Sequence, residues 1–256
     1  MTESTDRTDL VLVDRPSAEV AVVTINRPAK HNALTFELVE LLGQRLQELA
    51  DDPELRALVL TGAGEKAFTA GIDLSEIDSG AFTLEQIHPL SKFPHPVIGA
   101  INGVAVTGGL EVALNCDFRI ASTNARFADT HSRVGVTPAW GLTALLPTAV
   151  GDTWARQMSF TGDFVDAETA LRIGLVNEVH APERLLPRAV EIATAVASTT
   201  RSTLDRIRGI YDTVRAGSAG DAWRIEGEIA AAGFEMADPE AFAQRREQVF
   251  QRGRGQ

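Results

Sequence analysis

The sequence has only one cysteine, Cys116, among its 256 residues. A single thiol cannot form an intramolecular disulfide, and it excludes zinc or iron–sulfur sites that are built from several cysteines. The first ten residues are polar and acidic, without the basic start and the apolar stretch of a secretory signal. We therefore expect a cytoplasmic protein without a metal site.

Basic residues are also few. Lys and Arg number 24 against 35 for Asp and Glu, which gives a formal net charge of −11 at pH 7. This sign argues against general binding to nucleic acid or to an acidic membrane. We expect neither nucleic acid nor membrane as a partner, and any anionic ligand must be held by a local group of basic side chains.

The chain lacks an uninterrupted apolar run long enough to span a membrane. The most apolar segment, 97–116, has the length of a membrane span but contains Asn102, Glu111 and several glycines. Polar residues are costly in a bilayer, so this segment is better interpreted as buried core. Apolar residues make up 44% of the chain and charged residues 23%, close to the averages for globular proteins. The length predicts one large domain or one domain with a small appendage.

Strand-like and helix-like segments alternate up to about residue 180. The β-branched run 20–25 predicts a strand, and leucines three and four positions apart over 34–49 predict an amphipathic helix capped by Thr35. This order is typical of layered α/β structure. Beyond about residue 187 the pattern is almost purely helical. Further strands are expected at 57–60, 97–101, 117–121 and 174–179, and further helices at 148–160 and 167–172.

A glycine turn at 62–67 (GAGEKA) fits the G-x-G-x-x-A dinucleotide fingerprint. The fingerprint also needs a helix directly after the turn and an acidic residue at the end of a second strand, and neither is evident. A nicotinamide-dependent oxidoreductase is therefore disfavoured. We interpret the motif as a turn after a strand.

Two further glycine turns carry groups that could bind or move charge. Gly108 and Gly109 open an apolar helix, whose first N–H groups lack intrahelical partners and can bind an oxyanion. The same helix contains Glu111, and an apolar setting raises the pKa of a carboxyl, as acid–base catalysis near neutral pH requires. Tight packing at the glycines and a structural ion pair at Glu111 are the alternatives. The turn at 70–73 (AGID) either exposes a peptide N–H at Ile72 or is an ordinary loop.

Several short motifs occur in a fixed order: 26–28 (NRP), 32–34 (NAL), 67–74 (AFTAGIDL), 102–111 (NGVAVTGGLE), 160–162 (FTG) and 174–177 (GLVN). In sequence and spacing they resemble the enoyl-CoA hydratase/isomerase (crotonase) family, from about Val20 to Phe250. The resemblance implies an α/β fold, a crotonase-like spiral of repeated ββα units over 1–190 with a helical C-terminal region over 191–256. That region would serve oligomerisation and form part of the CoA site. A homotrimer or a dimer of trimers is the implied assembly.

The resemblance also implies a chemistry on acyl-CoA thioesters, with no cofactor besides this substrate. The peptide N–H groups of Ile72 and Gly108 match the pair that binds the thioester oxygen and stabilises an enolate. Glu111 matches the main acid or base, and Trp140 falls in the region of the acyl pocket. The substrate- or CoA-binding residues that match are Lys30, Ala70, Ile72, Asp73, Leu74 and Ser75.

The chain departs from the family at position 131. Typical hydratases carry a second glutamate twenty positions after the first, and this chain has His131 there. An imidazole can accept or donate a proton near neutral pH, so His131 could share the catalytic work. It could equally line the pocket or stabilise the fold. Asp129 is a less favoured substitute, because it does not align with the family's glutamate.

Three functions are compatible with these residues. The leading hypothesis is an enzyme of fatty-acid metabolism that hydrates trans-2-enoyl-CoA to 3-hydroxyacyl-CoA, with Glu111 and His131 as catalytic residues. A double-bond isomerase is the alternative, because Glu111 alone would suffice as its base. The third is a non-catalytic acyl-CoA binder, which the loss of the second glutamate permits.

Overall fold

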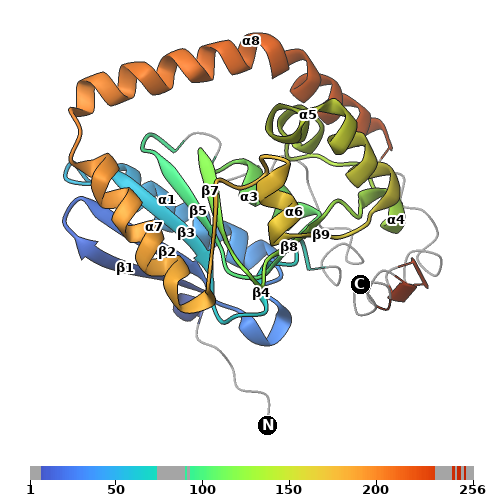
Figure 1. Ribbon diagram of the computed structural model, residues 1–256, viewed down its shortest axis with the longest axis horizontal. Helices are drawn as coiled ribbons and strands as arrows, with labels where there is room; N and C mark the ends of the chain where they lie inside the picture. The colour runs from blue at the N-terminus through green and yellow to red at the C-terminus, as the bar shows by residue number, and fades with distance from the viewer. Residues whose placement is uncertain are drawn as a thin grey trace.

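The computed structural model describes residues 7–73, 90, 93–233, 244–245, 247–248 and 251. Strands and helices of these residues form one layered body (Figure 1). The strands are β1 (Val11–Ser17), β2 (Val20–Ile25), β3 (Ala57–Gly62), β4 (Ala67–Thr69), β5 (Val97–Ile101), β6 (Val104–Val106), β7 (Phe118–Ser122), β8 (Arg126–Ala128), β9 (Val165–Asp166) and β10 (Glu178–His180). The helices are α1 (Phe36–Ala50), α3 (Gly108–Leu114), α4 (His131–Val134), α5 (Leu142–Thr161), α6 (Ala167–Arg172), α7 (Pro182–Ala197) and α8 (Arg201–Gly233), with the 3-10 turns η1 (Arg7–Leu10) and η2 (Pro28–Lys30).

The larger sheet has the strand order β1-β2-β3-β5-β7-β10 and is parallel except for β1. Successive side chains of a strand point to opposite faces of a sheet. Val22 and Val59, which are opposite each other in β2 and β3, pack with α7, whereas Val23 and Leu60 pack with α1 on the other face (Figure 1). Because both faces are covered, β3 and β5 are apolar without alternation.

Consecutive strands alternate between two sheets. β3 is followed by β4, β5 by β6 and β7 by β8, and the second strand of each pair belongs to the smaller sheet β4-β6-β8-β9. Helices α3 and α4 follow the last two of these pairs. This arrangement is the spiral of ββα units that the family resemblance implies, so the predicted fold class is confirmed.

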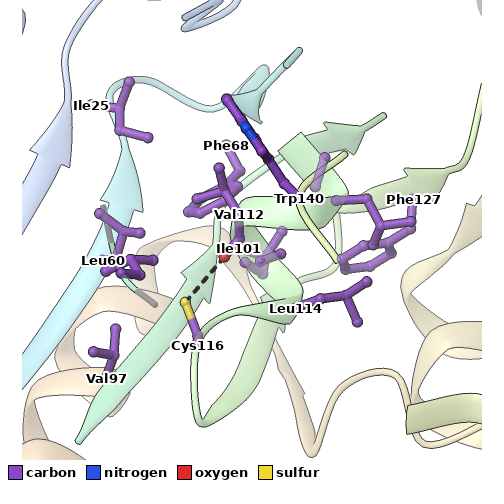
Figure 2. Packing of buried hydrophobic residues seen from close by; sticks show 14 of the residues in the cluster. Ile25, Leu60, Phe68, Val97, Ile101, Val112, Leu114, Cys116, Phe127 and Trp140 are labelled. Carbon is purple, nitrogen blue, oxygen red and sulfur yellow. Dashed lines mark hydrogen bonds between the residues drawn. The ribbon is translucent and has the colours of Figure 1, made fainter. Parts of the chain in front are cut away.

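Helix α3 lies in the centre of the core, and all of its residues are buried. Figure 2 shows Val112 of this helix among Phe68, Phe127 and their apolar neighbours. The thiol of Cys116 donates to the Val112 carbonyl oxygen at 3.7 Å, and burial raises the pKa of this thiol to about 12 (Figure 2). Segment 97–116 is therefore buried core, as predicted.

The strand expected at 174–179 is much shorter in the structure. Only β10 at its end pairs with the sheet, parallel to β7. Gly174 has a φ of +81° and turns the chain at the end of α6, which prevents an extended start. Leu175 and Val176 are apolar because they enter the core, not because they form a strand.

The predicted helices are present, and α6 has the bounds 167–172 that the sequence predicts. The helix expected at 148–160 begins earlier, at Leu142, and bends at Gly151, whose dihedral angles are not helical. Helix α1 begins where predicted, because the Thr35 hydroxyl accepts the Leu38 N–H at 3.2 Å as an N-cap.

The long helix α8 extends across one side of the molecule, and its later turns lie beside α5 (Figure 1). Among the described helices, none has the combination of length and apolar character that crossing a bilayer requires. The division of the chain after residue 190 stays a prediction.

Candidate active site

Glu111 lies in the middle of α3 and is only 3% exposed. Its Oε1 accepts a hydrogen bond from the peptide N–H of Trp140 at 2.8 Å. Burial raises the pKa of Glu111 to about 7, although the nearby His131 and the Trp140 N–H oppose this shift. The carboxyl is thus in the buried setting that the sequence predicts, and it can change protonation near neutral pH.

His131 begins the short helix α4 and faces Glu111. Its Nε2 lies 3.6 Å from Oε2 of Glu111. On the other side of the ring, Nδ1 lies 2.7 Å from Oδ1 of Asp129, which also accepts the His131 peptide N–H at 3.1 Å. Asp129 is 1% exposed. The three side chains therefore form a buried row in the order Asp129, His131, Glu111.

The neighbours in this row set the pKa of each group. Burial alone would lower the pKa of His131, but the hydrogen bond with Asp129 and the charge of Glu111 outweigh burial and raise it. Burial would raise the pKa of Asp129, but the hydrogen bond with His131 outweighs burial and lowers it. Asp129 therefore stays ionised, and Glu111 and His131 titrate as a coupled pair. Such a pair is suited to proton transfer at neutral pH.

Two peptide nitrogens meet where the turns at Ile72 and Gly108 come together. A bridge between Leu34 and Ile72 uses the N–H groups of Leu34 and Asp73, which donate to Gly71 O and Leu34 O at 2.8 Å each, and leaves out the Ile72 N–H. Gly108 is the first residue of α3, so its N–H has no intrahelical acceptor. A β-carbon placed on Gly108 would lie 3.4 Å from the Ile72 nitrogen. Within the described residues, neither N–H donates a hydrogen bond, so both are candidate donors to a ligand.

Gly108 and Gly109 serve different purposes. A β-carbon on Gly109 would lie 2.9 Å from the Thr69 carbonyl carbon and collide with its oxygen. On Gly108, a β-carbon would meet its nearest neighbours, which include the Trp140 ring, at 3.4 to 3.6 Å, which is ordinary contact. Tight packing therefore explains Gly109, but it does not explain Gly108.

Thr107, immediately before these glycines, has a φ of 55° and a ψ of −118°. This conformation is unusual for a β-branched residue and costs roughly 1–3 kcal/mol. Two contacts hold it: the Thr107 N–H donates to Ala128 O at 3.0 Å, and the hydroxyls of Thr107 and Thr130 lie 2.5 Å apart. The strained turn thus ties the start of α3 to the residue that precedes His131.

The predicted CoA-binding residues gather where loop 27–34 lies against the turn at 70–73. The Ala70 N–H donates to His31 O at 3.1 Å, and Nη1 of Arg27 pairs with Oδ2 of Asp73 at 2.5 Å. Lys30 is exposed in the same loop. The other two predicted residues, Leu74 and Ser75, lie outside the described residues.

The glycine turn at 62–67 does not have the context of a nucleotide fingerprint. A short strand, β4, follows it where the fingerprint needs a helix. A β-carbon on Gly62 would collide with the Phe68 carbonyl oxygen, so this glycine serves close packing. In the described ranges, no group of three or more His, Cys, Asp or Glu side chains is placed to hold a metal ion.

Sequence patterns do not predict the contacts that two acidic residues, Asp129 and Glu226, make near Glu111. Asp129 orients the His131 ring, and the Asp-x-His spacing is the signal that could have indicated this contact. Glu226, on α8, is buried against the turn that carries Trp140. A glutamate among exposed positions of a C-terminal helix gives no signal of this kind.

Comparisons with known proteins identify the family of this chain. A model of the enoyl-CoA hydratase/isomerase family matches residues 15–251. The chain is 43% identical to the short-chain-enoyl-CoA hydratase of Clostridium acetobutylicum over 70% of this chain and 72% of that protein. It is 34% identical to probable enoyl-CoA hydratase 1, peroxisomal, of Arabidopsis thaliana over 96% and 94% of the two chains. The crystal structure of an enoyl-CoA hydratase from Mycobacterium tuberculosis H37Rv superposes with a TM-score of 0.81 at 40% identity, covering 88% of this chain and 99% of that one. The family model covers nearly the whole chain and the relatives match it at 34–43% identity, and both lead to one conclusion: this protein belongs to the enoyl-CoA hydratase/isomerase family.

Proposed function

We propose that this enzyme hydrates trans-2-enoyl-CoA to 3-hydroxyacyl-CoA. One observation carries the proposal: Glu111 and His131 face each other at 3.6 Å in a buried site, where the charge of each affects the pKa of the other. Hydration needs one group to take a proton from water and another to give a proton to the α-carbon, whereas shifting a double bond needs a single base. The names of two relatives, a short-chain-enoyl-CoA hydratase and a crotonyl-CoA hydratase, also support hydration.

The peptide N–H groups of Ile72 and Gly108 bind the thioester oxygen in this proposal. Negative charge develops on that oxygen as water attacks carbon 3 of the acyl group. Fixed donors in a site that excludes water stabilise such charge, and each contributes about 3–4 kcal/mol. Because both donors belong to the main chain, the proposed site does not depend on which side chain residue 72 carries.

The proton transfers balance with one proton shared by the pair. In the reactive form, Glu111 is a carboxylate and His131 is protonated. Oε2 of Glu111 takes a proton from water while the water oxygen bonds to carbon 3. Nε2 of His131 then gives its proton to carbon 2 of the enolate. The proton on Glu111 then returns to His131, which restores the pair. Asp129 stays ionised throughout and holds Nδ1 of the ring, so that Nε2 faces Glu111.

Substrate binding completes the proposal. Ala70, Ile72, Asp73, Leu74 and Ser75 would contact CoA through one loop, with Lys30 near its phosphates, and Trp140 would form a wall of the acyl pocket. The Arg27–Asp73 ion pair supports the shape of this loop. A homotrimer or dimer of trimers, a cytoplasmic location and independence of any cofactor or metal also remain part of the proposal.

Purified protein tests this function with crotonyl-CoA, whose conjugated double bond loses its absorbance on hydration, and with a 3-enoyl-CoA. We expect crotonyl-CoA to be hydrated and Glu111→Gln to lower kcat by about 10²–10⁴-fold. Glu54→Gln, which changes an exposed acid, is the matched control. Faster conversion of the 3-enoyl-CoA than of crotonyl-CoA would overturn hydration in favour of isomerisation, and full activity of Glu111→Gln would remove Glu111 from the mechanism.

A further inference from the structure

We infer that Glu226, on the C-terminal helix α8, is a positioning residue for Glu111, because it holds the turn whose Trp140 N–H binds the Glu111 carboxyl. This inference rests on the proposed role of Glu111. It assigns the C-terminal helix a part in proton transfer that acts through the turn at Trp140 and Gly141.

The carboxylate of Glu226 is buried and accepts three hydrogen bonds from one turn. The donors are the peptide N–H groups of Gly141 and Thr143, at 2.5 and 2.6 Å, and the Thr143 hydroxyl. Helix α5 begins at Leu142, and its own N-cap residue is a glycine without a capping side chain. The first N–H groups of a helix need acceptors, and the helix dipole favours a negative charge there. Glu226 thus caps α5 from a different helix.

Trp223 fixes the same turn from the same face of α8. Residues three positions apart lie side by side on a helix, so Trp223 and Glu226 approach the turn together. A β-carbon on Gly141 would collide with the Trp223 ring, and Gly141 has a φ of +86°. Only glycine therefore allows the indole and the carboxylate to dock at once.

Trp140, the residue next to Gly141, connects this turn with Glu111. Its N–H donates to Oε1 of Glu111 at 2.8 Å, and its carbonyl oxygen accepts from Nδ2 of Asn115 at 3.2 Å. The same Nδ2 donates to the Glu111 carbonyl oxygen at 2.9 Å. A displacement of the turn would therefore move the donor that orients the Glu111 carboxyl.

The charge of Glu226 also acts on the proton-transferring pair. Glu111 faces the charges of His131, Glu226 and Asp129, and His131 faces Asp129, Glu111 and Glu226. Burial is the main cause of the raised pKa of Glu111, and Glu226 adds to it. Glu226 likewise favours protonated His131. Removal of this negative charge lowers the pKa of both groups.

Two variants of the full-length protein separate position from charge. Glu226→Gln removes the charge and should lower kcat for crotonyl-CoA at least tenfold, leave KM within twofold and move the midpoint of the pH profile of kcat to lower pH. Glu226→Asp keeps the charge but withdraws the carboxylate by one methylene, so it should lower kcat without moving that midpoint. Glu228→Gln, on the exposed face of α8, is the matched control and should behave as wild type.

Wild-type kcat in both Glu226 variants, a loss confined to KM, or an unmoved midpoint in Glu226→Gln would each overturn the inference. If Glu226→Gln does not fold, as judged by circular dichroism, Glu226→Asp still tests positioning. An NMR titration of the His131 imidazole gives a readout without turnover, and its pKa should fall in Glu226→Gln. If the wild type hydrates no enoyl-CoA, the proposed function fails, while this titration still tests the contact between α8 and the pair.

Discussion

The neighbouring glycines at the start of α3 give the sharpest test of the oxyanion site. In Gly108→Ala, the new methyl group meets its surroundings at 3.4 to 3.6 Å, which is ordinary contact, and Gly108 does not have a positive φ. Alanine should therefore leave stability unchanged or raise it by about 0.4–1 kcal/mol, because it restricts the unfolded chain. The same methyl lies 3.4 Å from the Ile72 nitrogen, in the proposed binding site of the thioester oxygen.

The expected loss of activity follows from the strength of one donor. If the methyl displaces the thioester oxygen from one of the two N–H groups, kcat should fall by about 10²–10³-fold. Gly109→Ala is the reverse case, because its methyl would overlap the Thr69 carbonyl group. Overpacking of this kind costs about 1–3 kcal/mol, and each kcal/mol lowers Tm by about 2–4 °C in a chain of this size.

The assays are thermal unfolding and crotonyl-CoA hydration for both variants. Gly108→Ala should unfold like the wild type and lose activity, whereas Gly109→Ala should unfold at a lower temperature. Wild-type kcat in Gly108→Ala would refute the reasoning, because the space between the two peptide nitrogens would then not be where the thioester binds. An unchanged Tm in Gly109→Ala would refute the packing assignment.

Three further predictions concern the buried row of Asp129, His131 and Glu111 and the turn at Gly141. Asp129→Asn should lower kcat about 10²–10⁴-fold and lower the pKa of His131, because the ring loses its ionised partner; unchanged kcat across the pH range would contradict this. Glu111 has a folded pKa of about 7 against an ordinary 4.5, so the folded state keeps a proton that the unfolded chain has lost, and stability falls as pH rises through this window. As the pH rises from 5 to 8, the free energy of unfolding of Glu111→Gln should therefore increase relative to that of the wild type by on the order of 3 kcal/mol, measured by chemical denaturation. A difference that does not change with pH would argue against the raised pKa. Gly141→Ala should destabilise the fold by about 1–3 kcal/mol in the same assay, because alanine strains the positive φ and collides with Trp223; wild-type stability would show that this turn tolerates a side chain.

Local patterns predict those parts of the site that depend on local structure. The burial of Glu111 follows from its apolar neighbours in α3, and the close approach of backbones follows from the glycines before it. The cap at Thr35 likewise depends on residues within one helical turn. Such features need no knowledge of the tertiary fold.

The remaining features depend on contacts between distant segments. The role of Asp129 depends on how the turn between β8 and α4 directs two side chains toward each other. Glu226 reaches Gly141 because α8 packs on α5, and no local pattern encodes that contact. The strand expected at 174–179 illustrates the opposite error, since apolar residues that enter the core resemble a strand in sequence.

The buried thiol of Cys116 can serve as a probe of local opening in the core of this enzyme. The thiol contacts α3, the helix that carries Glu111, through the Val112 carbonyl oxygen. Its raised pKa leaves almost none of the reactive thiolate at neutral pH. A sulfhydryl reagent can therefore label the native protein only when this part of the core opens. Because the chain has no second cysteine, the labelling rate reports only the opening of this part of the core.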